Sequence, residues 1–448
     1  MSTRHVFLDH AATTPLNERV LTAMMPYLSD SFGNPSAIYL SGRTAKTALA
    51  DARATVAGIL GAKPEEIIFT GSGTEANALA LFGVLRKHGG ALVTATTEHH
   101  AILNNARQLE KDGMSVTYVG VDRDGFVKID ELATAITSET TLVSIMYANN
   151  ETGTIAPMAD IARAIKMERE RRKQTGETRP IYFHTDACQA AGYLPLNVRE
   201  LGVDLMTMNG SKIYGPKGIG ALYVRKGILL SPLWHGGGQE NRLRSGTENV
   251  AGVVGFAEAL KITQEMRDTE GKRLTVLRDY FISELFNIIP KIVLNGPDPS
   301  QGLGERRIPN NVNISILDIE GEAYLLYLDH KGIEASTGSA CDSVTLDPSH
   351  VILALGRPYE YAHASLRFTL GRHTTKEDID YVLSVMPGIT TTLRKISPIS
   401  LPTDGTGIAS RAAFAGQGMP HWEVKNHKNI KSQDHEITKP RKHENIKS

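Results

Sequence analysis

From about residue 64 the chain alternates short apolar runs with stretches in which apolar residues recur every third or fourth position. The short runs predict strands, and the longer spacing predicts amphipathic helices. This alternation is typical of an α/β domain built on a mainly parallel sheet, whose ligands bind at the carboxyl ends of the strands. The predicted strands are 66–70, 91–96, 115–121, 141–148 and 180–186.

After about residue 260 the pattern changes to that of a smaller α+β unit. Its predicted elements are a helix over 273–289, a strand over 311–317, a helix over 320–331, a strand over 364–370 and a closing helix from residue 375. We therefore expect a large domain over 14–260 and a small domain formed by 1–13 and 261–390.

Two stretches depart from this pattern. Residues 166–179 are densely charged, which predicts a solvated helix extension that runs into a surface loop, an insertion rather than a site. From about residue 397 the chain is rich in Pro, Gly, Lys, His and Asn and poor in aliphatic residues. Such a composition cannot bury enough apolar surface to offset its ordering entropy, so we predict a disordered tail over 391–448.

Composition narrows the class of protein. Lys plus Arg and Asp plus Glu both total 49 in 448 residues, so no net charge favours nucleic acid or anionic membranes. The two cysteines cannot form a disulfide framework, and neither has a partner at metal-ligand spacing. No apolar stretch reaches the length of a membrane span. We expect a cytoplasmic protein without a metal site.

The strongest candidates for chemistry are a carboxylate and an amine near strand ends. Asp186 ends an apolar run, where a carboxylate is costly without a cationic or hydrogen-bonding partner. Lys212 lies on a turn of glycine, serine and apolar residues, where an amine loses its proton more easily. An amine for a Schiff base and a carboxylate for a pyridinium proton are what pyridoxal phosphate (PLP) requires. Taken alone, Asp186 could instead cap the next helical turn, and most lysines are surface charges.

Three further motifs follow predicted strands. Residues 71–77 form a glycine-rich start of a helix that suits a phosphate, although for such a motif taken alone a plain strand-to-helix turn is the commoner explanation, by roughly three to one. His99 could lie against a cofactor ring or be an ordinary loop residue. Residues 149–153 offer amide groups to a ligand, and their Asn and Gly content is also that of a turn.

The two cysteines differ in their surroundings. Cys188 is flanked by small residues, which favours a buried packing role. Cys341 lies in a small, polar run that is unsuited to a core, so we expect an accessible sulfur nucleophile, although Asp342 beside it opposes thiolate formation.

With these residues in view, the chain resembles the cysteine desulfurases of the NifS/IscS-like group, in the aminotransferase class V family on the PLP fold type I scaffold. The resemblance covers about 6–387. It is carried by segments 8–15, 32–35, 97–99, 149–151, 184–189, 212–218, 244–247, 338–341 and 366–368. It implies an α/β fold whose large domain has a mainly parallel seven-stranded sheet, a smaller α+β domain, and a homodimer.

The resemblance also assigns the residues around the PLP ring. It implies that Lys212 forms the Schiff base and that Asp186 pairs with the pyridine nitrogen. Gln189 would bond the phenolate oxygen of the ring, and His99 would stack on the ring and take part in proton transfer.

The phosphate would be held by Gly73, Thr74 and, from the second subunit, Thr247. Relatives usually carry Ser-Gly-His before the Schiff-base lysine, whereas this chain has Asn209-Gly210-Ser211. Asn209 and Ser211 can still donate hydrogen bonds to phosphate.

For the substrate, the resemblance implies that Arg367 and Asn150 hold the carboxylate of L-cysteine. Cys341 would then attack the sulfur, leaving a persulfide on the enzyme and alanine as product. This predicts a PLP-dependent L-cysteine desulfurase that passes sulfur to a protein acceptor, either an iron–sulfur scaffold or a thiolation enzyme, without contacting nucleic acid or membrane itself. One alternative is a selenocysteine lyase or another class V lyase or aminotransferase. Another is a noncatalytic sulfur-relay protein.

Overall fold

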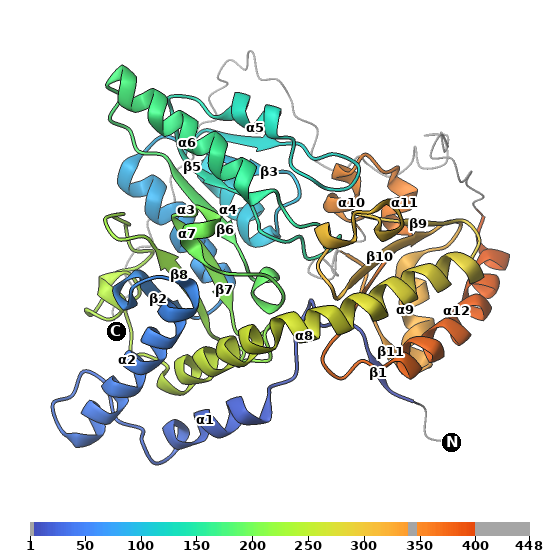
Figure 1. Cartoon of the computed structure of the whole chain (residues 1–448), viewed down its shortest axis with the longest axis horizontal. Coiled ribbons are helices and arrows are strands. Elements are labelled where there is room, and N and C mark those ends of the chain that lie inside the picture. The colour runs from blue at the N-terminus through green and yellow to red at the C-terminus, as the bar shows by residue number, and fades with distance from the viewer. Residues whose placement is uncertain (1–3, 339–346, 399–448) are drawn as a thin grey trace, which may run out of the picture. The chain divides into compact units, whose positions relative to one another are not determined.

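The computed structural model describes residues 4–338 and 347–398, and its largest element is a seven-stranded sheet (Figure 1). The strand order is β2-β8-β7-β6-β5-β3-β4. Strands β7, β6, β5, β3 and β4 run parallel, and β8 is antiparallel to both of its neighbours. The predicted mainly parallel α/β sheet is therefore confirmed. The strands are β2 Ile67–Thr70, β3 Ala91–Ala95, β4 Val116–Val119, β5 Thr140–Ser144, β6 Tyr182–Asp186, β7 Leu205–Asn209 and β8 Gly220–Val224.

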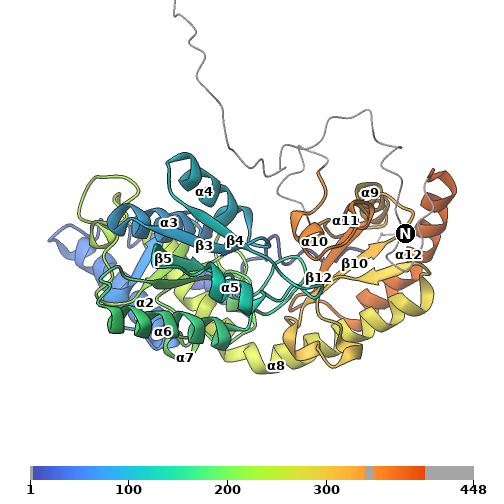
Figure 2. The same ribbon diagram turned by 90° about the horizontal axis from the view of Figure 1, so that it is seen from above.

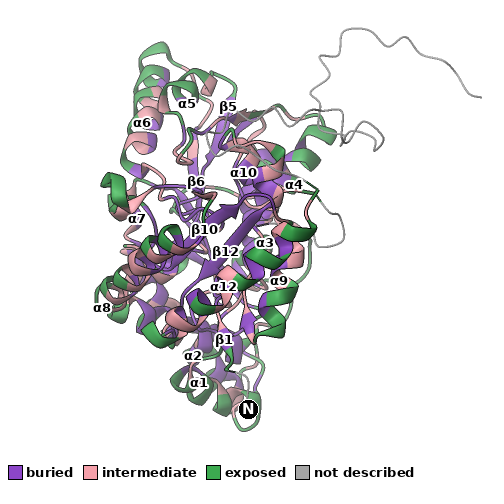
Figure 3. Cartoon of the chain, turned by 90° about the vertical axis from the view of Figure 1, so that its right-hand side faces the viewer, coloured by how far each residue is buried: buried purple, intermediate pink, exposed green. Residues whose placement is uncertain are grey.

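Helices cover both faces of this sheet (Figure 2). Because successive side chains of a strand point to opposite faces, Leu92 packs toward α3 and α4 while Val93 packs toward α2 and α6. Apart from the edge strand β4, in which Thr117 is exposed, the strands are accordingly buried on both sides (Figure 3). The helices of these two layers are α2 Leu40–Leu60, α3 Gly73–His88, α4 His100–Lys111, α6 Met158–Thr175, α7 Val198–Leu201 and the first half of α8 Val250–Ile288.

A second hydrophobic core forms around a three-stranded antiparallel sheet of order β12-β10-β9. It is covered by the second half of α8 together with α9 and α12, as the α+β pattern predicts. Its elements are β9 Ile292–Leu294, β10 Asn311–Ile316, α9 Gly321–His330, β12 Ser365–Thr369 and α12 Lys376–Ile396. The remaining helices and strands are β1 Val6–Phe7, α1 Glu18–Leu28, α5 Ile129–Ala135, β11 Ile333–Glu334, α10 His350–Ala354 and α11 Tyr359–His363.

The helix predicted over 273–289 is the second half of the much longer helix α8, which begins at Val250. Phe256 packs in the core of the large sheet, and Phe281 packs in the core of the small one. The division into two domains at residue 260 stays a prediction. Helix α12 continues to Ile396, so the first residues of the predicted tail are helical, and 399–448 lies outside the described residues.

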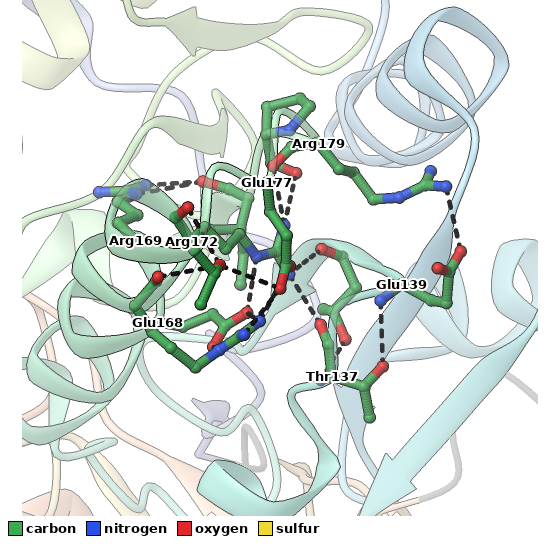
Figure 4. Close-up of polar contacts among 12 residues, drawn as sticks. Thr137, Glu139, Glu168, Arg169, Arg172, Glu177 and Arg179 are labelled. Carbon is green, nitrogen blue, oxygen red and sulfur yellow. Dashed lines mark hydrogen bonds and ion pairs between the residues drawn. The ribbon is translucent and has the colours of Figure 1, made fainter.

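The charged segment 166–179 is not uniformly solvated as predicted. Arg172 on α6 is almost completely buried (Figure 4). Its guanidinium donates hydrogen bonds to the carbonyls of Thr137 and Thr140 and pairs with Glu168. It therefore joins α6 to the start of β5, a structural role that charge density alone does not reveal. In the described part of the chain, no helix is long and apolar enough to cross a membrane.

Candidate active site

Asp186 is held at the carboxyl end of β6 by two donors. Its Oδ2 accepts a hydrogen bond from Asn77 Nδ2 of α3 at 2.6 Å, and its Oδ1 accepts one from the backbone N–H of Cys188 at 2.9 Å. The second bond closes a turn and does not cap a helix, because the next helical turn is Ala190–Gly192 and its N-cap is Gln189. No role for Asn77 was predicted from the sequence. Its only signal was its position one turn inside the glycine-rich helix start.

Lys212 and Gln189 both reach the N-terminal segment of the chain. Gln189 Nε2 donates to the carbonyl of Ala11 at 2.9 Å, and Lys212 Nζ donates to the carbonyl of Ala12. The backbone N–H of Thr14 in turn donates to the Ser211 carbonyl at 2.9 Å. Two residues that are predicted to hold the cofactor therefore converge on adjacent carbonyls, although about 180 residues separate Ala11 from Gln189 in the sequence.

His99 lies at the start of α4 and is half-buried. Its Nδ1 accepts a hydrogen bond from the backbone N–H of Ala101 at 3.0 Å. Burial lowers the pKa of His99, the charge of Asp186 raises it, and the charges of Lys212 and Arg367 lower it further. All of these groups are close enough to influence the imidazole. At neutral pH the ring is neutral, and since Nδ1 accepts, its proton is on Nε2.

Arg367 on β12 is buried and already paired. Its Nη2 bonds Asp9 Oδ1 at 2.9 Å, and its Nη1 donates to the Asn150 carbonyl at 3.2 Å. Arg367 Nε and Asn150 Oδ1 are buried with no hydrogen-bond partner among the residues that the structure describes. The structure thus brings the two predicted carboxylate-binding residues together and adds Asp9, for which no role was predicted from the sequence.

The predicted phosphate residues gather around the start of α3, apart from Thr247. A Cβ on Gly73 would come within 2.8 Å of Cys188 Sγ and 3.4 Å of Asn209 Cβ, so only glycine fits there. Ser72 caps the helix by accepting from the Glu75 N–H. The N–H groups of the first turn have no partners within the helix, which leaves a place for an anion. Thr74 is exposed, and Thr247 lies exposed on the loop before α8.

Of the two cysteines, only Cys188 lies within the described residues. Cys188 is partly exposed and not fully buried as predicted. Desolvation nevertheless raises the pKa of its thiol well above its usual range, and Asp186 raises it further, which disfavours a nucleophilic role. Cys341 and Asp342 lie outside the described residues.

This donor set suits PLP. An amine, a carboxylate, an amide and an imidazole come from one edge of the sheet, and a helix start without a side chain at Gly73 lies beside them. In addition, the Asn209 Oδ1 atom is buried and unpaired within the described residues, so this amide is available to a ligand.

Comparison with known proteins agrees with this geometry. The family model for aminotransferase class V matches residues 6–382. A protein named cysteine desulfurase IscS from Dictyoglomus turgidum is 50% identical over 398 residues, which cover 88% of this chain and 97% of the relative. Another of that name from Methanosarcina thermophila is 46% identical over 398 residues, covering 88% and 94%. A solved structure of a NifS-like protein superposes with a TM-score of 0.78 at 34% identity and covers 87% of this chain and 100% of that one.

Proposed function

The chain belongs to the aminotransferase class V family and, within it, to the cysteine desulfurases, and from this premise we propose that Cys341 receives the sulfur of L-cysteine. In the overall step, the C–S bond of L-cysteine breaks and an S–S bond forms on Cys341. Of the two thiol protons, one goes to the substrate Cβ, which completes L-alanine, and the other stays with the persulfide. The step needs no outside oxidant or reductant.

The observation that carries the proposal is the convergence of Asp186, Lys212 and Gln189 at one edge of the sheet. Lys212 would hold PLP covalently, Asp186 would face the ring nitrogen, and Gln189 would face the ring oxygen. When bound, PLP supplies an electron sink for charge that develops on the substrate carbon. Asn77 supports this role because its hydrogen bond fixes the direction of the Asp186 carboxylate.

His99 would move protons at its Nε2 atom. Because its Nδ1 accepts from the Ala101 N–H, the ring orientation is fixed and Nε2 is the atom left to face the cofactor ring. Burial lowers the pKa of His99, which keeps the ring neutral to a lower pH than that of an exposed histidine.

Gly73, Thr74, Asn209 and Ser211 would hold the phosphate. Thr247 is exposed in its own chain, which fits a contact with the phosphate of a second subunit in a homodimer. Large apolar side chains are exposed around the connection between α1 and α2, and a second subunit of the proposed homodimer would cover them. These side chains are Phe32, Ile38, Tyr39 and Leu40.

Arg367 and Asn150 would bind the substrate carboxylate. The Arg367 guanidinium is fixed by Asp9 on one side and by the Asn150 backbone on another, which orients it before substrate arrives. The persulfide on Cys341 would then pass to a protein acceptor, which is an iron–sulfur scaffold or a thiolation enzyme. We also infer a cytoplasmic location, because the thiol must stay reduced between turnovers.

Mass spectrometry after incubation with L-cysteine tests the proposal. We expect added sulfur on Cys341 together with free alanine, and no alanine from Cys341→Ala, which should retain its PLP absorbance. Alanine release by Cys341→Ala at the rate of the unaltered enzyme would contradict the proposal and would favour a lyase that needs no persulfide.

A further inference from the structure

Glu151 is a buried acid beside the candidate site, and no role above uses it. It is 4% exposed and lies on the loop that follows β5. Its backbone N–H donates to Asn149 Oδ1 at 2.8 Å. Its carbonyl accepts from Asn311 Nδ2 at 2.9 Å and from Asn313 Nδ2 at 3.1 Å. Because its backbone is held on both sides, the point from which its side chain starts is fixed.

The Glu151 carboxylate contacts a residue on each side of the segment that contains Cys341. On the C-terminal side, it accepts a hydrogen bond from Ser349 Oγ. Ser349 is 2% exposed and also caps α10, since its Oγ accepts from the Ile352 N–H. On the N-terminal side, Gly338 lies against the same carboxylate. A Cβ at this position would stand 2.0 Å from Glu151 Oε2, so only glycine allows the approach.

Each of these ends is also tied to the candidate site. Ser336, two residues before Gly338, forms two backbone hydrogen bonds with Arg367. The Ser336 N–H donates to the Arg367 carbonyl at 3.1 Å, and the Arg367 N–H donates to the Ser336 carbonyl at 2.6 Å. His350, next to Ser349, donates from Nε2 to the Glu98 carbonyl at 3.0 Å, one residue before His99. The segment that carries Cys341 therefore starts beside the predicted carboxylate-binding residue and ends beside the predicted proton-transfer residue.

From this arrangement we propose that Glu151 is a positioning residue that holds together both ends of the Cys341 segment and so sets the reach of the thiol. This inference rests on the proposed function of Cys341. A carboxylate suits this role better than a neutral acceptor such as a hydroxyl. It accepts from several donors at once, and hydrogen bonds to an ionised group are stronger than those to a neutral one. Because the rate of a transfer step depends steeply on how its reacting groups are positioned, freeing either of the two described ends should slow the sulfur transfer strongly.

The first test compares Glu151→Ala, Ser349→Ala and the double variant with the unaltered enzyme. Each single change should lower kcat for alanine release about tenfold with KM changed less than about twofold, because the substrate site is untouched. The kcat of the double variant should also be about tenfold below that of the unaltered enzyme, and no lower, because the two changes break the same hydrogen bond between Ser349 and Glu151. Glu151→Gln keeps an acceptor oxygen for Ser349 and should stay within about threefold of the unaltered rate. If the reduction in kcat of the double variant equalled the product of the two single reductions, the two side chains would act independently and the proposal would be overturned.

The second test needs no turnover. The rate at which iodoacetamide alkylates Cys341, relative to Cys188 in the same chain, is measured by peptide mass spectrometry without L-cysteine. Glu151→Ala should raise this ratio about threefold or more by freeing the segment, whereas exposed Glu131→Gln, the matched control, should leave it unchanged. An unchanged ratio in Glu151→Ala, with Cys188 alkylated at its unaltered rate as the sign of an intact fold, would refute the positioning role. Failure of the proposed function would appear separately, as alanine release by Cys341→Ala.

Discussion

His184 gives a prediction whose size follows directly from the structure. This residue lies on β6, two positions before Asp186, and is completely buried. Its Nδ1 is 2.8 Å from Ser144 Oγ and its Nε2 is 3.0 Å from Thr207 Oγ1, so a neutral ring is fully bonded. Burial lowers the pKa of His184 from 6.5 to about 4, and the nearby charge of Asp186 offsets only part of that shift.

The sign of the pH effect follows from this lowered pKa. In the unfolded chain the ring takes up a proton as the pH falls through 6.5, whereas in the folded chain it stays neutral until about 4. The contribution of the neutral ring to stability is therefore complete above pH 6.5 and is lost progressively as the pH falls toward 4. Between pH 7 and pH 5 this linkage lowers the free energy of unfolding by about 2 kcal/mol.

Urea unfolding at pH 7 and at pH 5, followed by tryptophan fluorescence, checks this value. His184→Gln can still bond Ser144 and Thr207 but does not titrate, so its loss of stability between the two pH values should be smaller by about 2 kcal/mol. His350, whose pKa burial also lowers to about 4, provides a parallel case in His350→Gln. An equal loss in His184→Gln and in the unaltered protein would refute the reasoning.

Three other changes test the site and the fold. Arg367→Lys should raise KM for L-cysteine about tenfold or more, because an ammonium cannot reproduce the planar guanidinium that Asp9 orients. Alanine release measures this KM, and an unchanged value would argue against Arg367 as the carboxylate-binding residue. Gly73→Ala should weaken PLP binding about tenfold in equilibrium dialysis, because the added methyl group would meet Cys188 Sγ. Combining Gly73→Ala with Cys188→Ala should restore most of the lost affinity, and no recovery would show that the contact with Cys188 is not the cause. Arg172→Met should lower the free energy of unfolding by about 3 kcal/mol by leaving buried carbonyls unpaired, with the specific activity of folded enzyme unchanged; wild-type stability in urea would show that the buried guanidinium contributes nothing.

Local patterns were enough to predict most elements and the chemistry at the strand ends. Asp186 and Lys212 could be found because each sits where a short apolar run gives way to small or polar residues. Helix α8 was only half predicted. Its middle is polar between two apolar stretches, which looks like a break in sequence, yet a helix that passes from one core to another has such a middle where it meets water.

The pairings between distant segments could not be predicted. Nothing near Asp186 indicates that Asn77 would donate to it, and nothing near Arg367 indicates Asp9 as its partner. Arg172 shows the converse case, because its neighbours are charged and it is nevertheless buried among carbonyls. Such contacts depend on how helices and loops are placed on the sheet, which local periodicity does not specify.

The amino-acid sequence by itself determined the α/β class, five of the seven strands of the large sheet and the residue types that a sulfur-transferring PLP enzyme needs, because strand periodicity and strand-end chemistry are local properties; strands β7 and β8 were not predicted. The tertiary structure alone decided which of these residues meet. It brought the carbonyls of Ala11 and Ala12 to Gln189 and Lys212, and it brought Gly338 and Ser349 to Glu151, because only packing of distant segments sets distances between groups that are far apart along the chain.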